Sequence, residues 1–224
     1  MKQLTKITLL TSSLFLIGCG GGGGSSTTST DSSSGSSSST PQTKTGYFID
    51  AAVQGLDYNT SSQLTGTTNA QGEFSYKEGD EVSFYIGKLS LGSGKPESTG
   101  LIKPATLTKN DATKTTLLLR TLQGLDDDNN ASNGIRIQNT TRVSLDSIPP
   151  KRFDELEENE LINLNDDIKR RLDTNNDGVI DVSDNEANRH HEDSLQTFEN
   201  ENREREREND NEDDDNRNTT GTTT

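Results

Sequence analysis

The sequence has few of the residues that build a large hydrophobic core. Of its 224 residues, 25% are hydrophobic and 4% are aromatic, and there is no tryptophan. Low apolar content combined with a formal net charge of -15 favours disorder over much of a chain. We therefore predict a modest ordered middle between disordered ends.

Basic residues are also scarce, with 22 Lys and Arg against 37 Asp and Glu. An acidic surface repels phosphate groups, and no basic stripe offsets it, which argues against nucleic-acid binding. Acidic side chains suit cations instead. The sequence contains no Gly-x-Ser-x-Gly, no HExxH and no phosphate loop, so we expect no enzymatic activity.

Cysteine is nearly absent too, and the single Cys19 has no second thiol with which to form an internal disulfide. Lys2 and Lys6 precede an apolar run at 7–17, which is shorter than the about 20 residues needed to span a bilayer. A charged start followed by a short apolar run predicts a signal peptide at 1–18.

The residues that end this run, "LIGC", resemble the lipobox of bacterial lipoproteins. The resemblance implies cleavage before Cys19 and acylation of its thiol, by palmitate for example, and of the new amine. It makes the membrane a partner through the lipid anchor. Gly20 in place of Asp implies the outer membrane, with the side of that membrane left open. The alternative is an ordinary secretory signal with an incidental cysteine.

Two further segments follow the predicted anchor. Residues 19–45 are almost entirely Gly, Ser and Thr, a composition typical of a flexible tether. At 46–100, "GEFSY" and "EVSFYIG" alternate apolar and polar residues, as half-buried strands do. The run "TGTTNAQGEFSYKEGDEVSFYIG" resembles carboxypeptidase-regulatory-like and prealbumin-like β-sandwich domains. The resemblance implies a small antiparallel β-sandwich-like domain and says almost nothing about function.

The region 101–148 combines a predicted helix with a polar loop. Asn110 or Asp111 can cap the helix, and Gly124 can end it. In the following "LDDDNNASNGI", alternate positions carry oxygen ligands as in a cation loop, although Ala131 and Ile137 occupy positions where an EF-hand needs glycine and an acid. The oxygen-bearing residues are Asp126, Asp128 and Asn130. A polar turn is the preferred interpretation, and a second ion at 126–133 is left open.

Pro149-Pro150 is predicted to open a helix in the segment 149–198. Its apolar stripe consists of Leu161, Leu164, Ile168 and Leu172. The remaining residues, 199–224, are charged and polar without an apolar face. They suit either a solvated single helix or disorder, and we predict a disordered acidic tail. The fold class expected for the whole chain is α+β.

The strongest motif follows the stripe: "DTNNDGVIDVSD" matches the EF-hand pattern D-x-[DN]-x-[DN]-G. Alternate side chains point oxygens inward, Gly178 permits the sharp turn, and the seventh position contributes a backbone carbonyl. The motif predicts a calcium site, with Ile180 anchoring the loop in the core. The predicted ligands are Asp173, Asn175, Asp177, Val179, Asp181 and Asp184.

The loop departs from the EF-hand pattern at its twelfth position, where Asp184 replaces glutamate. It also resembles dockerin-type calcium loops, which carry Asp there. A dockerin needs two such loops, however, and only one is convincing in this chain. The alternative is an acidic turn that binds no ion.

His190 and His191 are neighbours that point to different sides of a helix, and we expect them on a solvated polar face rather than in a zinc site. Together these features predict a non-enzymatic, calcium-binding lipoprotein of the cell envelope with a structural or interaction role. The alternative is an accessory lipoprotein of a secretion or envelope-assembly machine whose acidic tail engages a basic partner.

Overall fold

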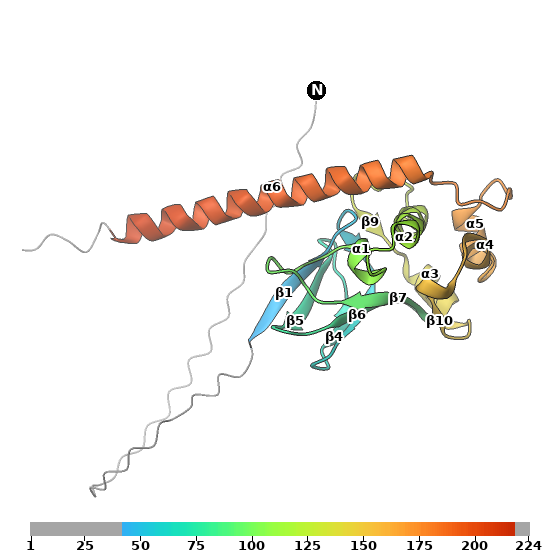
Figure 1. Ribbon diagram of the computed structural model, residues 1–224, viewed down its shortest axis with the longest axis horizontal. Helices are drawn as coiled ribbons and strands as arrows, with labels where there is room; N and C mark the ends of the chain where they lie inside the picture. The colour runs from blue at the N-terminus through green and yellow to red at the C-terminus, as the bar shows by residue number, and fades with distance from the viewer. Residues whose placement is uncertain (1–41, 218–224) are drawn as a thin grey trace, which may run out of the picture. The chain divides into compact units, whose positions relative to one another are not determined.

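The computed structural model describes residues 42–217, which form a mixed α+β fold as predicted (Figure 1). The predicted signal peptide, Cys19 and most of the tether lie outside the described residues, as do the last seven residues of the tail. The strands are β1 (Thr43–Phe48), β2 (Val53–Gln54), β3 (Asp57–Thr60), β4 (Thr65–Thr67), β5 (Glu73–Lys77), β6 (Val82–Ile86), β7 (Leu89–Gly94), β8 (Leu101–Ile102), β9 (Ile135–Arg136) and β10 (Lys151–Arg152). The helices are α1 (Pro104–Leu107), α2 (Ala112–Gly124), α3 (Asn139–Asp146), α4 (Glu158–Ile162), α5 (Asp166–Leu172) and α6 (Asp184–Arg217), with a 3-10 turn at Phe153–Glu155.

Two main sheets face each other across the core. One has the order β5-β1-β8 and the other β10-β7-β6-β3-β4, and β2 pairs with β9 separately. The alternation in β5 and β6 buries every second side chain, as the sequence predicts. Aromatic rings join the sheets, with the ring of Phe84 centred 4.9 Å from Phe48 and 5.2 Å from Phe74.

The two sheets do not close into the predicted sandwich, and their pairing is not purely antiparallel. The last three strands each join their sheet in parallel, β8 to β1, β9 to β2 and β10 to β7. Helices supply the rest of the core, because Leu118 and Leu122 of α2 and Ile168 and Leu172 of α5 share one apolar cluster with the sheets. The segments at 46–100, 101–148 and 149–198 therefore have a common core.

Helix α2 has the bounds that its sequence predicts. Its N-cap is Asp111, whose Oδ1 accepts the backbone N–H of Lys114 at 3.0 Å, and it ends at Gly124. The prediction that Pro149-Pro150 opens a helix is wrong, because β10 and the 3-10 turn follow these prolines and the apolar stripe is divided between α4 and α5. The break between α4 and α5 has a local cause. The side chain of Asn165 accepts the N–H groups of Asp167 and Ile168, which starts a new helix.

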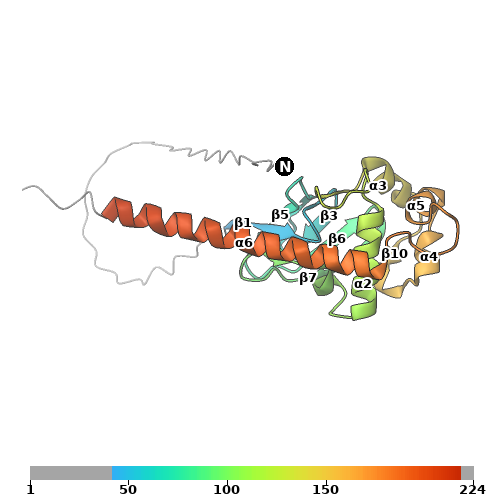
Figure 2. The same cartoon turned by 90° about the horizontal axis from the view of Figure 1, so that it is seen from above.

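Helix α6 lies across α2 and β1 and extends beyond the sheets (Figures 1 and 2). Residues 199–217, which the sequence predicts to be disordered, are helical here, in line with the solvated-helix alternative. Two contacts support this stretch. Phe198 packs on Tyr47 with ring centroids 5.3 Å apart, and the guanidinium of Arg205 lies 5.9 Å from the same tyrosine ring.

Candidate cation site

The first half of the loop at 173–184 is organised around Asp173, which lies at the end of α5 and is 2% exposed. Its Oδ1 accepts the N–H of Asp177 at 2.9 Å, and its Oδ2 accepts the N–H of Gly178 at 3.1 Å. The Oδ1 of Asn175 accepts the same Asp177 N–H at 2.8 Å. The structure thus brings together the first, third and fifth predicted ligands, and the φ of Gly178 is 87° as the sharp turn requires.

The second half of the loop is anchored by Ile180, which is 2% exposed and belongs to the main core, as predicted. The neighbouring Val179 is exposed, and its N–H binds Oδ1 of Asp177 at 2.9 Å. A Cβ on Gly124 of α2 would lie 2.9 Å from Leu172 and 3.7 Å from Ile180. A glycine at the end of α2 therefore leaves room for Leu172, which precedes the loop, and for Ile180 within it.

The ninth and twelfth positions have other partners in this structure. Oδ2 of Asp181 accepts the backbone N–H of Thr174 at 3.0 Å and its hydroxyl at 2.5 Å. Asp184, at the start of α6, has a side chain 68% exposed, and its Oδ1 lies 3.2 Å from Nη1 of Arg120. Within residues 42–217, three carboxylates gather within 4.8 Å of one another at Asp126, Asp127 and Asp128, and not in this loop.

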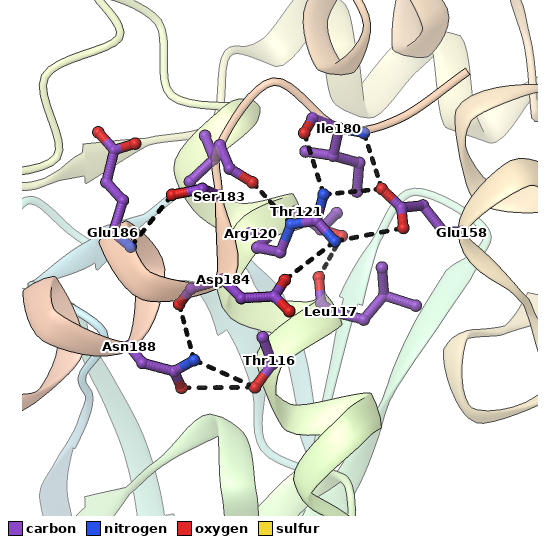
Figure 3. A network of polar contacts seen from close by, with 11 residues as sticks. Thr116, Leu117, Arg120, Thr121, Glu158, Ile180, Ser183, Asp184, Glu186 and Asn188 are labelled. Carbon is purple, nitrogen blue, oxygen red and sulfur yellow. Dashed lines mark hydrogen bonds and ion pairs between the residues drawn. The ribbon is translucent and has the colours of Figure 1, made fainter. Parts of the chain in front are cut away.

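An ion pair between the buried Arg120 of α2 and the partly exposed Glu158 of α4 holds the loop against these two helices (Figure 3). Nη2 of Arg120 donates to Oε1 of Glu158 at 2.8 Å and to the carbonyl of Ile180 at 3.0 Å, and its Nε donates to the carbonyl of Val182 at 2.6 Å. Oε1 of Glu158 accepts the N–H of Ile180 at 2.7 Å. The pair therefore satisfies both backbone groups of Ile180, which would be costly to bury alone.

The sequence-based prediction did not include Arg120 or Glu158. A signal was present, because an arginine within the apolar run of a predicted core helix implies a buried acceptor. The identity of that acceptor was not predictable, since Glu158 lies 38 residues away and in a segment predicted as one continuous helix.

The polar loop after α2 has a similar turn with its oxygens engaged internally. Asp126 is 2% exposed and accepts the N–H groups of Asn130 at 2.9 Å and Arg136 at 2.8 Å. Burial raises the pKa of the Asp126 carboxyl, and these backbone bonds oppose that rise. Asp127 pairs with the Arg136 side chain, and Asp128 accepts from Asn133 at 2.9 Å. These contacts stabilise the turn from within, and its interpretation as a polar turn without an ion stays a prediction.

The two histidines are not on a solvated face, contrary to the sequence-based expectation. The side chains of His190 and His191 are 17% and 12% exposed, and both lie against the buried carboxylate of Asp50. The prediction failed because the docking of α6 over β1 and α2 depends on tertiary packing, which the charged sequence around the histidines does not indicate.

Comparison of the chain with protein families, with curated proteins and with solved structures found no match in any of the three. Among the described residues, no helix combines the length and the apolar character that crossing a membrane requires.

Proposed function

We propose that this chain is a calcium-binding lipoprotein of the cell envelope, anchored in the outer membrane through Cys19, with a structural or interaction role. The observation that carries the calcium proposal is the arrangement of Asp173. Its buried carboxylate receives the N–H groups of Asp177 and Gly178 and so closes the turn around which the loop's other oxygens are placed. The anchor is supported by the resemblance of "LIGC" to a lipobox.

The donor set fits calcium, which prefers carboxylate, amide and backbone oxygens. Asp173, Asn175, Asp177 and the carbonyl of Val179 would hold the ion from the first half of the loop. Asp181 and Asp184 would complete the set from the second half. The two latter carboxylates are engaged by Thr174 and Arg120 here, so the ion would compete with those partners.

This competition is modest at Asp184. Its side chain is largely exposed, and exposed ion pairs contribute about 0–1 kcal/mol. Arg120 keeps its bonds to Glu158 and to the two carbonyls when Asp184 leaves. A cation in the loop would therefore be held between α5 and the start of α6 without unpairing a buried charge.

Calorimetry and thermal unfolding of the full chain with calcium test the proposal. Calcium should release or absorb heat on binding and should stabilise the fold by about 2.7 kcal/mol at one hundred times its dissociation constant. Magnesium should do less, because it demands an octahedral shell and gives up water reluctantly. The full chain is required because Ile168, Leu172 and Ile180 belong to a core shared with the sheets.

Two matched variants locate the ion. Asp177→Ala removes the side-chain oxygens of the fifth position, one of which accepts the N–H of Val179, so calcium binding should be lost. Asp128→Ala makes the same change in the other acidic turn and should leave binding unchanged. Calcium heat that survives Asp177→Ala, or that disappears only in Asp128→Ala, would refute this assignment.

A further inference from the structure

A fully buried carboxylate lies between helix α6 and the rest of the domain. Asp50 follows β1 and is 0% exposed. Nε2 of Gln123, from α2, lies 3.3 Å from each of its oxygens and 3.2 Å from the carbonyl of Ala187 in α6. A neutral amide is thus the hydrogen-bond donor to this carboxylate, and it leaves the negative charge uncompensated.

Two imidazoles of α6 face the same carboxylate. Nδ1 of His191 lies 3.3 Å and Nδ1 of His190 lies 3.9 Å from Oδ1 of Asp50. Both Nδ1 atoms are buried and have no hydrogen-bond partner. A buried, unpaired carboxylate is strongly destabilising, whereas an imidazolium beside it compensates the charge. The docking of α6 is therefore fully stabilised only when one of the two histidines is protonated.

We propose that Asp50, His190 and His191 form a proton-operated latch that holds α6 on the domain. With one imidazolium present, the ion pair to Asp50 keeps α6 against α2 and β1. When that proton leaves, the carboxylate remains buried beside neutral rings, and α6 loosens. The latch does not depend on the calcium site, because it uses other residues and another contact of α6.

The surrounding groups set the direction of this response. The nearby carboxylate of Asp50 raises the pKa of His190, burial opposes the rise, and the backbone of Ala131 and the charge of Asp193 add to it. From the elements packed on the latch, the β1–β2 turn contributes the charge of Asp50, α2 contributes the neutral Gln123, and Asp193 belongs to α6 itself. A raised pKa means that the stabilisation is fully present below pH 6.5 and is lost as the pH rises through the folded pKa.

A metal ion is the competing source of positive charge. In the part of the chain that the structure describes, Asp50 and the two histidines do not form a group with ligand atoms all within 4.8 Å. Both Nδ1 atoms approach the same oxygen, Oδ1 of Asp50. Because the three ligand atoms are not all within 4.8 Å of one another, the geometry favours a proton over a metal ion.

Hydrogen exchange on the full chain tests the latch. Protection factors of amides 187–198 should be measured from about pH 5 to about pH 8, the range over which imidazoles titrate, and corrected for intrinsic exchange. Protection should fall as the pH rises, while amides of α2 serve as the internal reference. NMR titration of His190 should give a midpoint above 6.5. The fold decrease in protection should equal the factor by which the docking of α6 lowers the acid dissociation constant of His190.

Two kinds of variant separate the latch from general pH effects. Asp50→Asn should return the His190 midpoint towards 6.5 and should make the protection of α6 independent of pH. Asp154→Asn changes an exposed carboxylate paired with Arg152 and should retain the pH dependence. If Asp50→Asn does not fold, the double change His190→Gln with His191→Gln should also abolish the dependence.

Three results would overturn the proposal. The first is protection of α6 that stays constant or rises with pH in the native sequence. The second is a pH dependence that persists in Asp50→Asn or in the double histidine variant. The third is protection that responds to zinc and to a chelator but not to pH, which would assign the positive charge to a metal.

Discussion

At the scale of single residues, Arg120 has the largest structural role among the charged side chains that surround the loop. Its side chain is 9% exposed and contacts Glu158, Asp184 and two backbone carbonyls of the loop. Glu158 is 30% exposed, so the loss of Arg120 would leave this carboxylate partly solvated, but it would leave the two backbone carbonyls without their donor. The loss of Arg120 should therefore destabilise the protein more than the loss of an arginine from an exposed ion pair, such as that of Arg152 with Asp154.

We predict that Arg120→Met destabilises the protein by about 1–3 kcal/mol, because the carbonyls of Ile180 and Val182 lose their donor and the partly exposed Glu158 loses its partner. The matched control is Arg152→Met, since Arg152 is 58% exposed where it pairs with Asp154, and exposed pairs are worth about 0–1 kcal/mol. Urea unfolding measures both variants. Equal losses of stability for the two would contradict this role of Arg120.

At the scale of elements, α6 differs from the other helices in how it is held. Its first turns contact α2, Asp50 and the core through Ala187, whereas its middle is held by a small cluster separate from the main core. That cluster consists of Ile49, Leu101 and Phe198, with Tyr47 and Leu195 packed against it. Helices held by few buried contacts open locally at low cost.

We predict that Phe198→Ala releases the part of α6 beyond Leu195 and leaves the rest of the fold intact. Hydrogen exchange should become faster at 195–205, while the melting temperature changes little, because Phe198 is not part of the main core. Phe153→Ala is the control, since Phe153 is 0% exposed within that core and its loss should cost about 3–5 kcal/mol. A large drop in melting temperature for Phe198→Ala would show that α6 docking supports the whole fold.

At the scale of the whole molecule, the proposed function joins a cation-binding domain to a lipid anchor. The ordered domain has a single main core to which the sheets, α2, α4 and α5 all contribute. The anchor, Cys19, lies outside the described residues, and its role rests on the sequence. A domain of this kind would be held at the membrane by acyl chains rather than by a spanning helix.

We predict that Cys19→Ser moves the protein from the membrane fraction to the soluble fraction. Each buried CH₂ of an acyl chain contributes about 0.8 kcal/mol, so an anchor with more than one chain is effectively permanent, and its loss should be complete. Fractionation of cells that express the two forms measures this. A Cys19→Ser protein that stays with the membrane would exclude the lipoprotein assignment.

The sequence alone was sufficient for features that depend on local chemistry. The alternation of β5 and β6, the bounds of α2 between Asp111 and Gly124, and the turn at Gly178 follow from side-chain periodicity, capping and backbone freedom. The inward position of Ile180 was predicted for the same reason, because a buried apolar residue must follow the turn of such a loop.

Only the tertiary structure decided the features that join distant segments. The parallel addition of β8, β9 and β10, the pairing of Arg120 with Glu158, and the burial of Asp50 beneath α6 all depend on which surfaces pack together. The break between α4 and α5 does have a local cause in the capping side chain of Asn165. The apolar stripe that continues across the break nevertheless favoured a single helix. The course of α6 was not predictable from its charged sequence, because its position is determined by Ala187, the two histidines and Phe198, each of which acquires its partner from another part of the chain.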